Sequence, residues 1–149
     1  MSGSGSSPVP AQADLRPATP DDVAPVLAFW LRAAEPTSTD SAEALAGLLR
    51  HDPGALIVAE ADGRIVGSVI AGWDGWRGAI YRLAVAPEHR RRGLGQSLLR
   101  AAEERLAALG GRRLHAIVME ANTNAVAFWD ATDWEHQAGQ LRFAKGYQE

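Results

Sequence analysis

The sequence contains no cysteine among its 149 residues. This absence excludes disulfide bonds, thiolate metal sites and a thiol nucleophile. No apolar run approaches the ~20 residues that a membrane-spanning helix needs. The formal net charge of −3 also gives the chain no overall basic character. We therefore expect a cytoplasmic protein that binds neither membranes nor nucleic acid.

The N-terminus lacks the basic and apolar segments of a secretory signal. Its first 13 residues are rich in Gly, Ser and Pro, which is typical of flexible chain, so we predict a flexible tail over residues 1–13. Residues 14–149 show no internal repeat and are long enough for one domain with its own core. We predict a single domain over that range.

Apolar periodicity predicts alternating strands and helices along this domain. A first helix begins at Thr19 or Asp22, and Asp62-Gly63 has the composition of a tight hairpin turn. The further predicted elements are a helix over 41–50, hairpin strands over 55–60 and 64–71, a strand over 79–85, a helix that ends at Gly110-Gly111, a strand over 113–119, a helix over 124–132 and two strands within 134–147. The apolar Met119 and Phe143 are predicted core residues, as is His115.

A basic turn with two glycines separates the strand over 79–85 from the helix that follows. It contains Arg90, Arg91 and Arg92, followed by Gly93 and Gly95. The first N–H groups of a helix have no partner within it, and the helix dipole adds about half a positive charge there. Glycine lets the backbone approach a phosphate closely. The turn therefore predicts a pyrophosphate site, while an ordinary connection with solvated arginines is the structural alternative.

Two motifs together resemble a known family. The segment Arg-Arg-Arg-Gly-Leu-Gly at 90–95 resembles the R/Q-x-x-G-x-G/A motif of the GNAT N-acetyltransferases, and it lies between a strand and a helix as it does there. Residues 122–134 are similar to the family's N-x-x-A-x-x-(L/F)-Y-x-x-x-G-F segment. Residues 73–81 also resemble a branch of poorly characterised bacterial members. The resemblance covers nearly the whole chain after the tail.

The resemblance implies an α/β (α+β) fold and a bound donor. The expected sheet is mixed, mostly antiparallel and six- to seven-stranded, with helices on both faces. Its two central parallel strands, 79–85 and 113–119, would splay at one end and hold acetyl-CoA. The residues implied to bind the donor are Leu83, Ala84, Val85, Arg90, Arg91, Arg92, Gly93, Leu94, Gly95, Gln96, Asn122, Phe128 and Trp129. No metal is expected.

The implied chemistry is direct attack of a neutral amine on the thioester, with the backbone N–H of Val85 polarising its carbonyl. A base is expected for the amine proton, and the choices are Glu120 at a strand end and Tyr81, which shares its side-chain parity with Leu83 and Val85. The family commonly has tyrosine where this chain has Trp129, and an indole is no useful acid. Either another group protonates the thiolate, or the thiolate leaves unprotonated.

The acceptor is the least predictable part. Trp30, Trp73, Asp74 and Trp76 are the predicted acceptor pocket, although Asp74 also suits an Asp-Gly turn and the tryptophans also suit simple packing. We predict transfer to a primary amine of a small molecule, peptide or protein. The alternative is a CoA-binding sensor or regulatory protein with little transferase activity, and the sequence does not separate a monomer from a homodimer.

Overall fold

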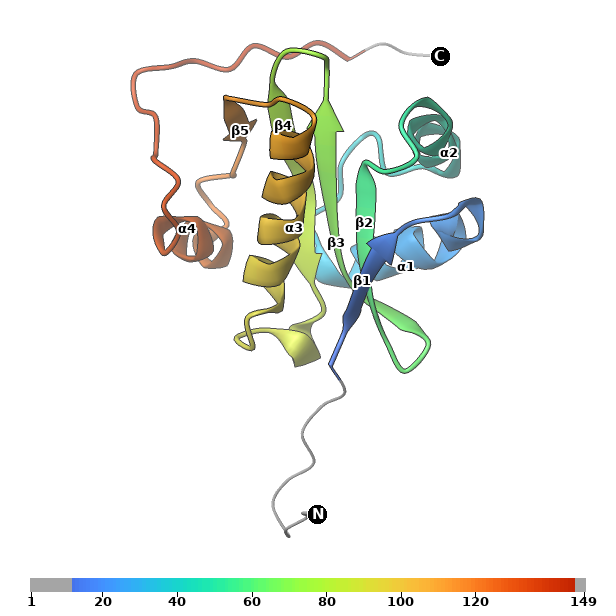
Figure 1. Cartoon of the computed structure of the whole chain (residues 1–149). Helices are drawn as coiled ribbons and strands as arrows, with labels where there is room; N and C mark the ends of the chain where they lie inside the picture. Colours follow the sequence, from blue (N-terminus) through green and yellow to red (C-terminus); the bar gives the residue numbers. More distant parts are fainter. Residues whose placement is uncertain (1–11, 147–149) are drawn as a thin grey trace, which may run out of the picture. The chain divides into compact units, whose positions relative to one another are not determined.

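The computed structural model describes residues 12–146 (Figure 1). The tail predicted over residues 1–13 lies outside this range, apart from Gln12 and Ala13. Chain contacts divide the molecule into two compact units, Met1–Ala116 and Ile117–Glu149, which are described in turn. A single domain over 14–149 stays a prediction.

The first unit contains a five-stranded sheet in the order β1-β2-β3-β4-β5. The strands are β1 (Asp14–Pro17), β2 (Leu56–Ala61), β3 (Arg64–Trp73), β4 (Gly78–Val85) and β5 (Leu114–Ala116). The helices are α1 (Val23–Ala33), α2 (Ala42–His51) and α3 (Leu94–Ala108). The pairs from β1 to β4 are antiparallel and only β4–β5 is parallel. The predicted mixed, mostly antiparallel sheet is confirmed, with five strands in residues 12–146 instead of six or seven.

Helices cover both faces of this sheet (Figure 1). The Ser68 side chain on β3 bonds to Trp30 of α1, whereas a Cβ at the neighbouring Gly67 would meet Leu98 of α3. Successive side chains of a strand point to opposite faces, so α1 and α3 lie on opposite sides of β3. Their buried side chains, such as Val26 and Leu106, form the core with the middle strands.

Local sequence signals set the turns as predicted. Asp62 and Gly63 both have positive φ, 53° and 74°, as a two-residue type I′ hairpin requires, and β2 ends directly before them. Helix α3 ends at the predicted glycines, where the N–H of Gly111 bonds to the carbonyl of Leu106 at 2.8 Å. The N–H of Gly110 bonds to Ala107, which completes a Schellman motif.

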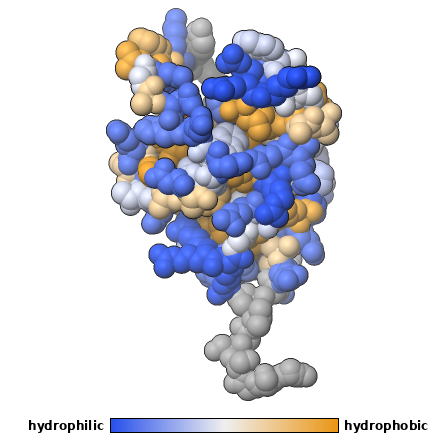
Figure 2. Space-filling view, turned by 60° about the vertical axis from the view of Figure 1, so that its left-hand side comes forward, coloured by the Kyte–Doolittle hydropathy of each residue, from blue (hydrophilic) through white to orange (hydrophobic). Residues whose placement is uncertain are grey.

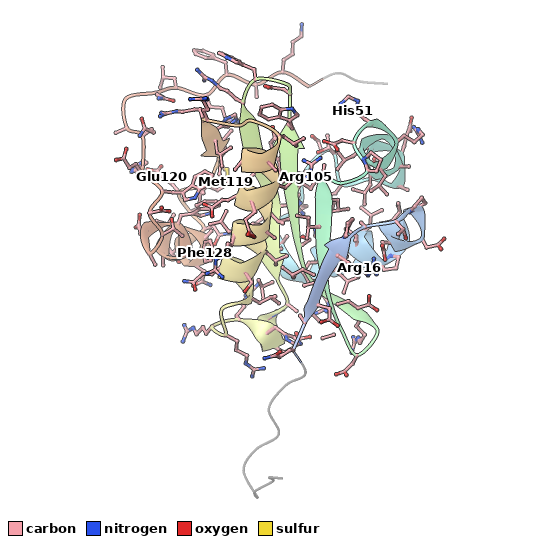
Figure 3. The ribbon with its side chains drawn as sticks, in the orientation of Figure 1. Arg16, His51, Arg105, Met119, Glu120 and Phe128 are labelled. Atoms are coloured by element: carbon pink, nitrogen blue, oxygen red, sulfur yellow. The ribbon has the colours of Figure 1, made fainter. Side chains whose placement is uncertain are left out.

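The start of α1 is held by an ion pair. Asp22 is the N-cap of α1, after a short 3₁₀ turn (Pro20–Asp22), and its Oδ2 accepts from the backbone N–H of Thr19 at 2.7 Å. Arg16 on β1 donates to both Asp22 oxygens, at 2.7 and 2.9 Å, and to Glu60 on β2 at 2.8 Å (Figure 3). The guanidinium of Arg16 holds the pKa of Asp22 down at about 2.

Strand β5 is shorter than predicted. It pairs with β4 from Gly78 to Ile80, and residues 117–119 are not strand. Residues 117–119 belong to the second unit, so the splay of the two parallel strands stays a prediction.

The second unit contains one helix, α4 (Thr123–Asp130), within its described residues. The two strands predicted over 134–147 are wrong for residues 134–146, which form only a turn at Gly139, and Tyr147 lies outside the described residues. Leu141 and Phe143 alternate with polar residues here, but both are exposed, and a two-stranded hairpin whose apolar side chains are not covered is marginally stable at best. Met119 and Phe143 are 64% and 89% exposed, so their prediction as core is also wrong, as it is for the exposed His115.

The surface shown in Figure 2 is mostly hydrophilic, with apolar patches between the charged side chains. Every helix in residues 12–146 is too short or too polar to cross a lipid bilayer.

We predict that Asp22→Asn lowers the free energy of unfolding by about 2 kcal/mol at pH 7, because asparagine keeps the bond to Thr19 but loses the charge. The pKa of Asp22 lies at about 2 when folded against an ordinary 3.8, so its carboxylate stabilises the fold above pH 3.8. This contribution disappears as the pH falls towards 2. Denaturant unfolding of both proteins between pH 7 and 2.5 measures it, with Asp21→Asn as the exposed control. A difference that does not change with pH would contradict the assignment.

Candidate functional site

The site begins at the open edge of β4. Beyond Ile80, no strand of residues 12–146 pairs with β4 on the side where β5 has left. On its other side β4 continues to pair with β3 as far as Val85, opposite Gly67. The last part of β4 therefore presents one free backbone edge.

The backbone of Val85 faces this open edge. The N–H of Ala86 bonds to the carbonyl of Val66 on β3 at 2.8 Å. In an antiparallel ladder alternate residues direct their backbone groups to opposite sides, so the groups of Leu83 and Val85 point away from β3. An extended ligand at this edge would meet them as an added strand does. The Val85 carbonyl already accepts from Arg90, and the predicted role of the Val85 N–H stays a prediction.

The start of α3 has no side-chain cap. Gly93 is its N-cap with φ 82°, a left-handed conformation that favours glycine, and no side chain bonds to the first N–H groups. By contrast, Ser41 caps α2 and Asn122 caps α4 through their side-chain oxygens. The N–H groups of Leu94, Gly95 and Gln96 are thus left for an outside acceptor, which is the arrangement of an anion site.

The three arginines of the turn have different roles. Arg90 donates from Nε to the carbonyl of Val85 at 3.1 Å and from Nη2 to Ala33 at the end of α1 at 3.3 Å. Arg90 therefore connects the end of α1 to the end of β4. This structural role is an alternative to the predicted binding of phosphate by its side chain. Arg91 and Arg92 are exposed beside the helix start.

A β-bulge interrupts β4 next to the open edge. The register with β3 shifts between Ser68 and Ile70, so that Ser68 pairs with Ala84 whereas Ile70 pairs with Tyr81. Arg82, inside the bulge, has a positive φ of 51°. Cross-strand partners share a face. Tyr81, opposite Ile70, therefore lies on the α1 face, whereas Val85, opposite Gly67, lies on the α3 face. The predicted shared parity of these two residues is wrong, because the bulge adds one residue to β4.

Arg82 connects three segments that are distant in the sequence. Its carbonyl accepts from Ser68 Oγ at 2.8 Å, and Ser68 Oγ in turn accepts from the Trp30 indole N–H at 2.8 Å. Trp30 is only 3% exposed, so the prediction that it lines an acceptor pocket is wrong. The sequence did not lead us to predict the hydrogen bonds that join Trp30, Ser68 and Arg82. A serine within the apolar run 65–71 was the signal that could have revealed it, because a buried hydroxyl needs hydrogen-bond partners.

The predicted loop of acceptor residues lies at the opposite end of β4. Trp73, Asp74 and Trp76 precede this eight-residue strand, whereas the thioester is expected near its other end. With a rise of about 3.3 Å per residue the separation is roughly 23 Å. A small acceptor cannot contact both places, so this loop does not suit the predicted acceptor pocket.

The loop itself is ordered by its aspartate. Asp74 Oδ1 accepts from the backbone N–H groups of Trp76 and Arg77 at 2.8 and 2.7 Å. These bonds lower the pKa of Asp74, those from Arg77 and then Trp76 contributing most. A hollow of about 480 Å³ adjoins the loop; it is lined by Trp73, Gly75, Trp76, Arg77, Leu109, Gly110, Arg112 and Arg113.

The remaining predicted residues belong to the second unit. Asn122 caps α4 by accepting the N–H of Ala125 at 3.1 Å. Glu120 is exposed and lies in the turn closed by Asn122 N–H and Met119 carbonyl, not at the end of a strand (Figure 3). The rings of Phe128 and Trp129 make an edge-to-face contact, with 5.6 Å between their centroids. Within residues 12–146, no three His, Asp or Glu side chains are grouped to bind a metal ion.

The sequence profile of the acetyltransferase (GNAT) family matches residues 20–132. The chain belongs to this family. An acetyltransferase of Yersinia pestis (strain Pestoides F) is 42% identical over 89 residues, which are 60% of this chain and 63% of the relative. One from Pectobacterium atrosepticum is 40% identical over 87 residues, 58% of this chain and 62% of the relative. The chain thus matches less than two thirds of the length of these relatives.

Solved GNAT-like structures share the fold. The apo aminoglycoside antibiotic 6'-N-acetyltransferase of Acinetobacter haemolyticus aligns with a TM-score of 0.73 at 16% identity, over 91% of this chain and 99% of that one. An aminoglycoside N-acetyltransferase in complex with CoA aligns with a TM-score of 0.71 at 18% identity, over 93% of this chain and 98% of that one. At this identity the likeness concerns the fold alone, and it confirms the predicted fold class.

We predict that Arg90→Ala lowers the free energy of unfolding by about 1 kcal/mol, because two backbone carbonyls lose their donor. Arg92→Ala should change it by no more than about 0.5 kcal/mol, since the Arg92 side chain, exposed like that of Arg90, makes no hydrogen bond within residues 12–146. Denaturant unfolding at pH 7 measures both variants. Equal values for the two would show that Arg90 does not hold α1 to β4.

Proposed function

We propose that this GNAT family member is an acetyl-CoA-dependent N-acetyltransferase that acts on a primary amine. The observation that supports it best is the combination of an uncapped α3 start with an open strand edge leading to it. Such a pair suits a ligand with an extended amide-containing arm and a pyrophosphate at one end. Acetyl-CoA has both features, and a structural neighbour binds CoA.

The residues of β4 and the turn supply binding and polarisation. The N–H groups of residues 94–96 would bind the pyrophosphate, and Arg91 and Arg92 would add positive charge. The free backbone edge at Leu83 would hold the pantetheine arm. Bound acetyl-CoA supplies an activated acyl group. A neutral amine would attack the thioester carbonyl carbon, the C–S bond would break so that CoA leaves as a thiolate, and the amine proton would pass to a base or to that thiolate. The Val85 N–H would stabilise the negative charge that develops on the thioester oxygen.

The acceptor would approach from the α1 face. Helix α3 covers the other face of β3, and Tyr81 on the α1 face is 52% exposed. Tyr81 remains our candidate for the base or its relay, and Glu120 remains a second one. Two structural neighbours are aminoglycoside N-acetyltransferases, so small polyamines and amino sugars are the first acceptors that we propose.

We predict that saturating acetyl-CoA raises the Tm of the protein, because a ligand that binds only the folded state stabilises it. Thiol release with neamine, spermidine and a hexapeptide carrying a free N-terminal amine then measures transfer. A rise in Tm without any thiol release would favour the CoA-binding sensor over the enzyme. The absence of any Tm shift would contradict both.

A second prediction concerns the helix start. Gly95→Glu should raise the Kd for acetyl-CoA at least about tenfold, because a carboxylate would repel the pyrophosphate from the N–H groups. The fold should remain intact, since acidic residues stabilise helix N-termini. Ala108→Glu adds the same charge at the exposed other end of α3 and serves as the control in titration calorimetry. Equal affinities for the two variants would disprove the placement of the pyrophosphate.

A further inference from the structure

The guanidinium of Arg82 is the most constrained charged group near the open edge. It lies over the Trp30 ring, with 4.7 Å between the Arg82 Cζ atom and the ring centroid. Only 14% of the Arg82 side chain is exposed. Nη1 donates to the carbonyl of Glu35 at 2.9 Å, and Nη2 donates to Asp40 Oδ2 at 2.8 Å. Both partners belong to the loop between α1 and α2.

Asp40 organises that loop. Its Oδ1 accepts from the Thr37 hydroxyl at 2.7 Å and its Oδ2 from the Thr37 backbone N–H at 3.1 Å. The N–H of Asp40 bonds back to the Thr37 carbonyl at 3.3 Å. The loop over residues 35–41 therefore folds around the Asp40 carboxylate, and the same carboxylate binds Arg82.

This arrangement is costly for stability alone. The Nε of Arg82 is buried and has no hydrogen-bond partner in residues 12–146. Burial also lowers the pKa of Arg82, although Asp40 opposes that effect. A buried ion pair with an unsatisfied donor is often no more stable than an apolar side chain of similar size. Arg82 also has a positive φ, which disfavours a residue with a side chain.

We propose that Arg82 is a positioning residue that holds the loop over residues 35–41 against the bulge of β4 and so shapes the acceptor side of the site. The inference rests on the proposed function, because an acceptor must reach the open edge of β4 from the α1 face. Tyr81 lies on that face directly before Arg82, and Arg82 itself bonds to Glu35 and Asp40 of the loop. The Arg82 guanidinium thus connects β4, whose Val85 N–H would polarise the thioester, with the loop over residues 35–41, which would meet the amine.

Arg105 provides a matched control elsewhere in the same unit. It also donates to a backbone carbonyl, that of Ala71 at 2.6 Å, and to an aspartate, Asp52, at 2.5 Å. Its side chain is 19% exposed, close to the 14% of Arg82. It extends from α3 to the residues that follow α2, away from the bulge (Figure 3). Arg82→Met and Arg105→Met therefore remove equivalent interactions at two different places.

Hydrogen exchange of the full chain tests the positioning directly, without any acceptor. In Arg82→Met we expect amide exchange over residues 35–41 to rise about tenfold or more, and no such change in Arg105→Met. Arg105→Met should instead speed exchange at Ala55, whose N–H bonds to the Asp52 carbonyl. Unchanged exchange over residues 35–41 in Arg82→Met would overturn the proposal.

Kinetics test the acceptor side. With whichever of neamine, spermidine or the hexapeptide is acetylated fastest, Arg82→Met should raise the acceptor KM about tenfold, whereas the Kd for acetyl-CoA stays within about twofold. Arg82→Lys keeps the positive charge but not the planar guanidinium with its two donor nitrogens. Its acceptor KM should therefore lie between those of the wild type and Arg82→Met. Equal effects of Arg82→Met and Arg105→Met on KM would overturn the acceptor role, as would an equal loss of acetyl-CoA affinity. Acetyl-CoA binding with no turnover of any amine would reject the proposed function and this acceptor role, whereas the exchange result would still decide the anchoring.

If Arg82→Met does not fold, Asp40→Asn serves in its place, because it removes the charge that faces Arg82. Asparagine also replaces one of the two Asp40 oxygens that accept from Thr37, so Thr37→Val, which loses only the hydroxyl bond, is the control, and exchange must rise more in Asp40→Asn than in this control. We expect the same increase in exchange over residues 35–41 and the same direction of change in KM. Wild-type values for Asp40→Asn would overturn the proposal.

Discussion

The end of the β4–β5 pairing at Ile80 is the constraint on which the candidate site depends. Backbone N–H and C=O groups that face no strand must find other partners, and an open edge is a template for an extended ligand. Here the edge leads to a helix whose first N–H groups are also free of side-chain caps. Two sets of unsatisfied donors thus follow each other along the chain. In the proposed function they would bind two parts of the same donor, the arm and the pyrophosphate.

Arginine side chains hold the surroundings of this surface together. The chain has no cysteine, and partly buried guanidinium groups connect segments that lie far apart in its sequence. Arg16 holds the start of α1, Arg90 its end, and Arg82 the loop that follows it. A guanidinium is suited to this because its fixed fork can bind a carboxylate and a carbonyl at once. The partly buried contacts of Arg16 and Arg82 contribute more than exposed ion pairs, which are screened by solvent, whereas Arg90 is exposed.

The donor and acceptor sides of the site differ in how they are built. The donor side consists mainly of backbone groups, which depend on strand pairing and helix geometry and need only glycine at close approaches. The acceptor side, as proposed, would consist of side chains from the loop after α1 and from the bulge of β4. Backbone sites tolerate large sequence differences, which is consistent with a shared fold at 16% identity. Side-chain sites change with each substitution, so family membership alone does not name the amine.

Much of the fold could be predicted because local rules were sufficient. The Asp62-Gly63 turn, the cap at Asp22 and the glycine end of α3 each depend on a few neighbouring residues. The strands expected over 134–147 could not be predicted reliably, because a strand forms only where a neighbour accepts its hydrogen bonds. The same holds for the length of β5. Nothing in residues 113–119 themselves indicates where they leave β4.

The sequence by itself determined the donor motif, since Gly93 and the residues after it are contiguous and set the helix start locally. Only the tertiary structure decided the acceptor side. One extra residue in β4 reversed the face of Tyr81 relative to Val85, and a hydrogen bond to Ser68 placed Trp30 in the core. Arg82 and Asp40 are 42 residues apart, and no local pattern relates them. Their pairing follows from the packing of α1 on the sheet, which brings the loop after this helix to the bulge.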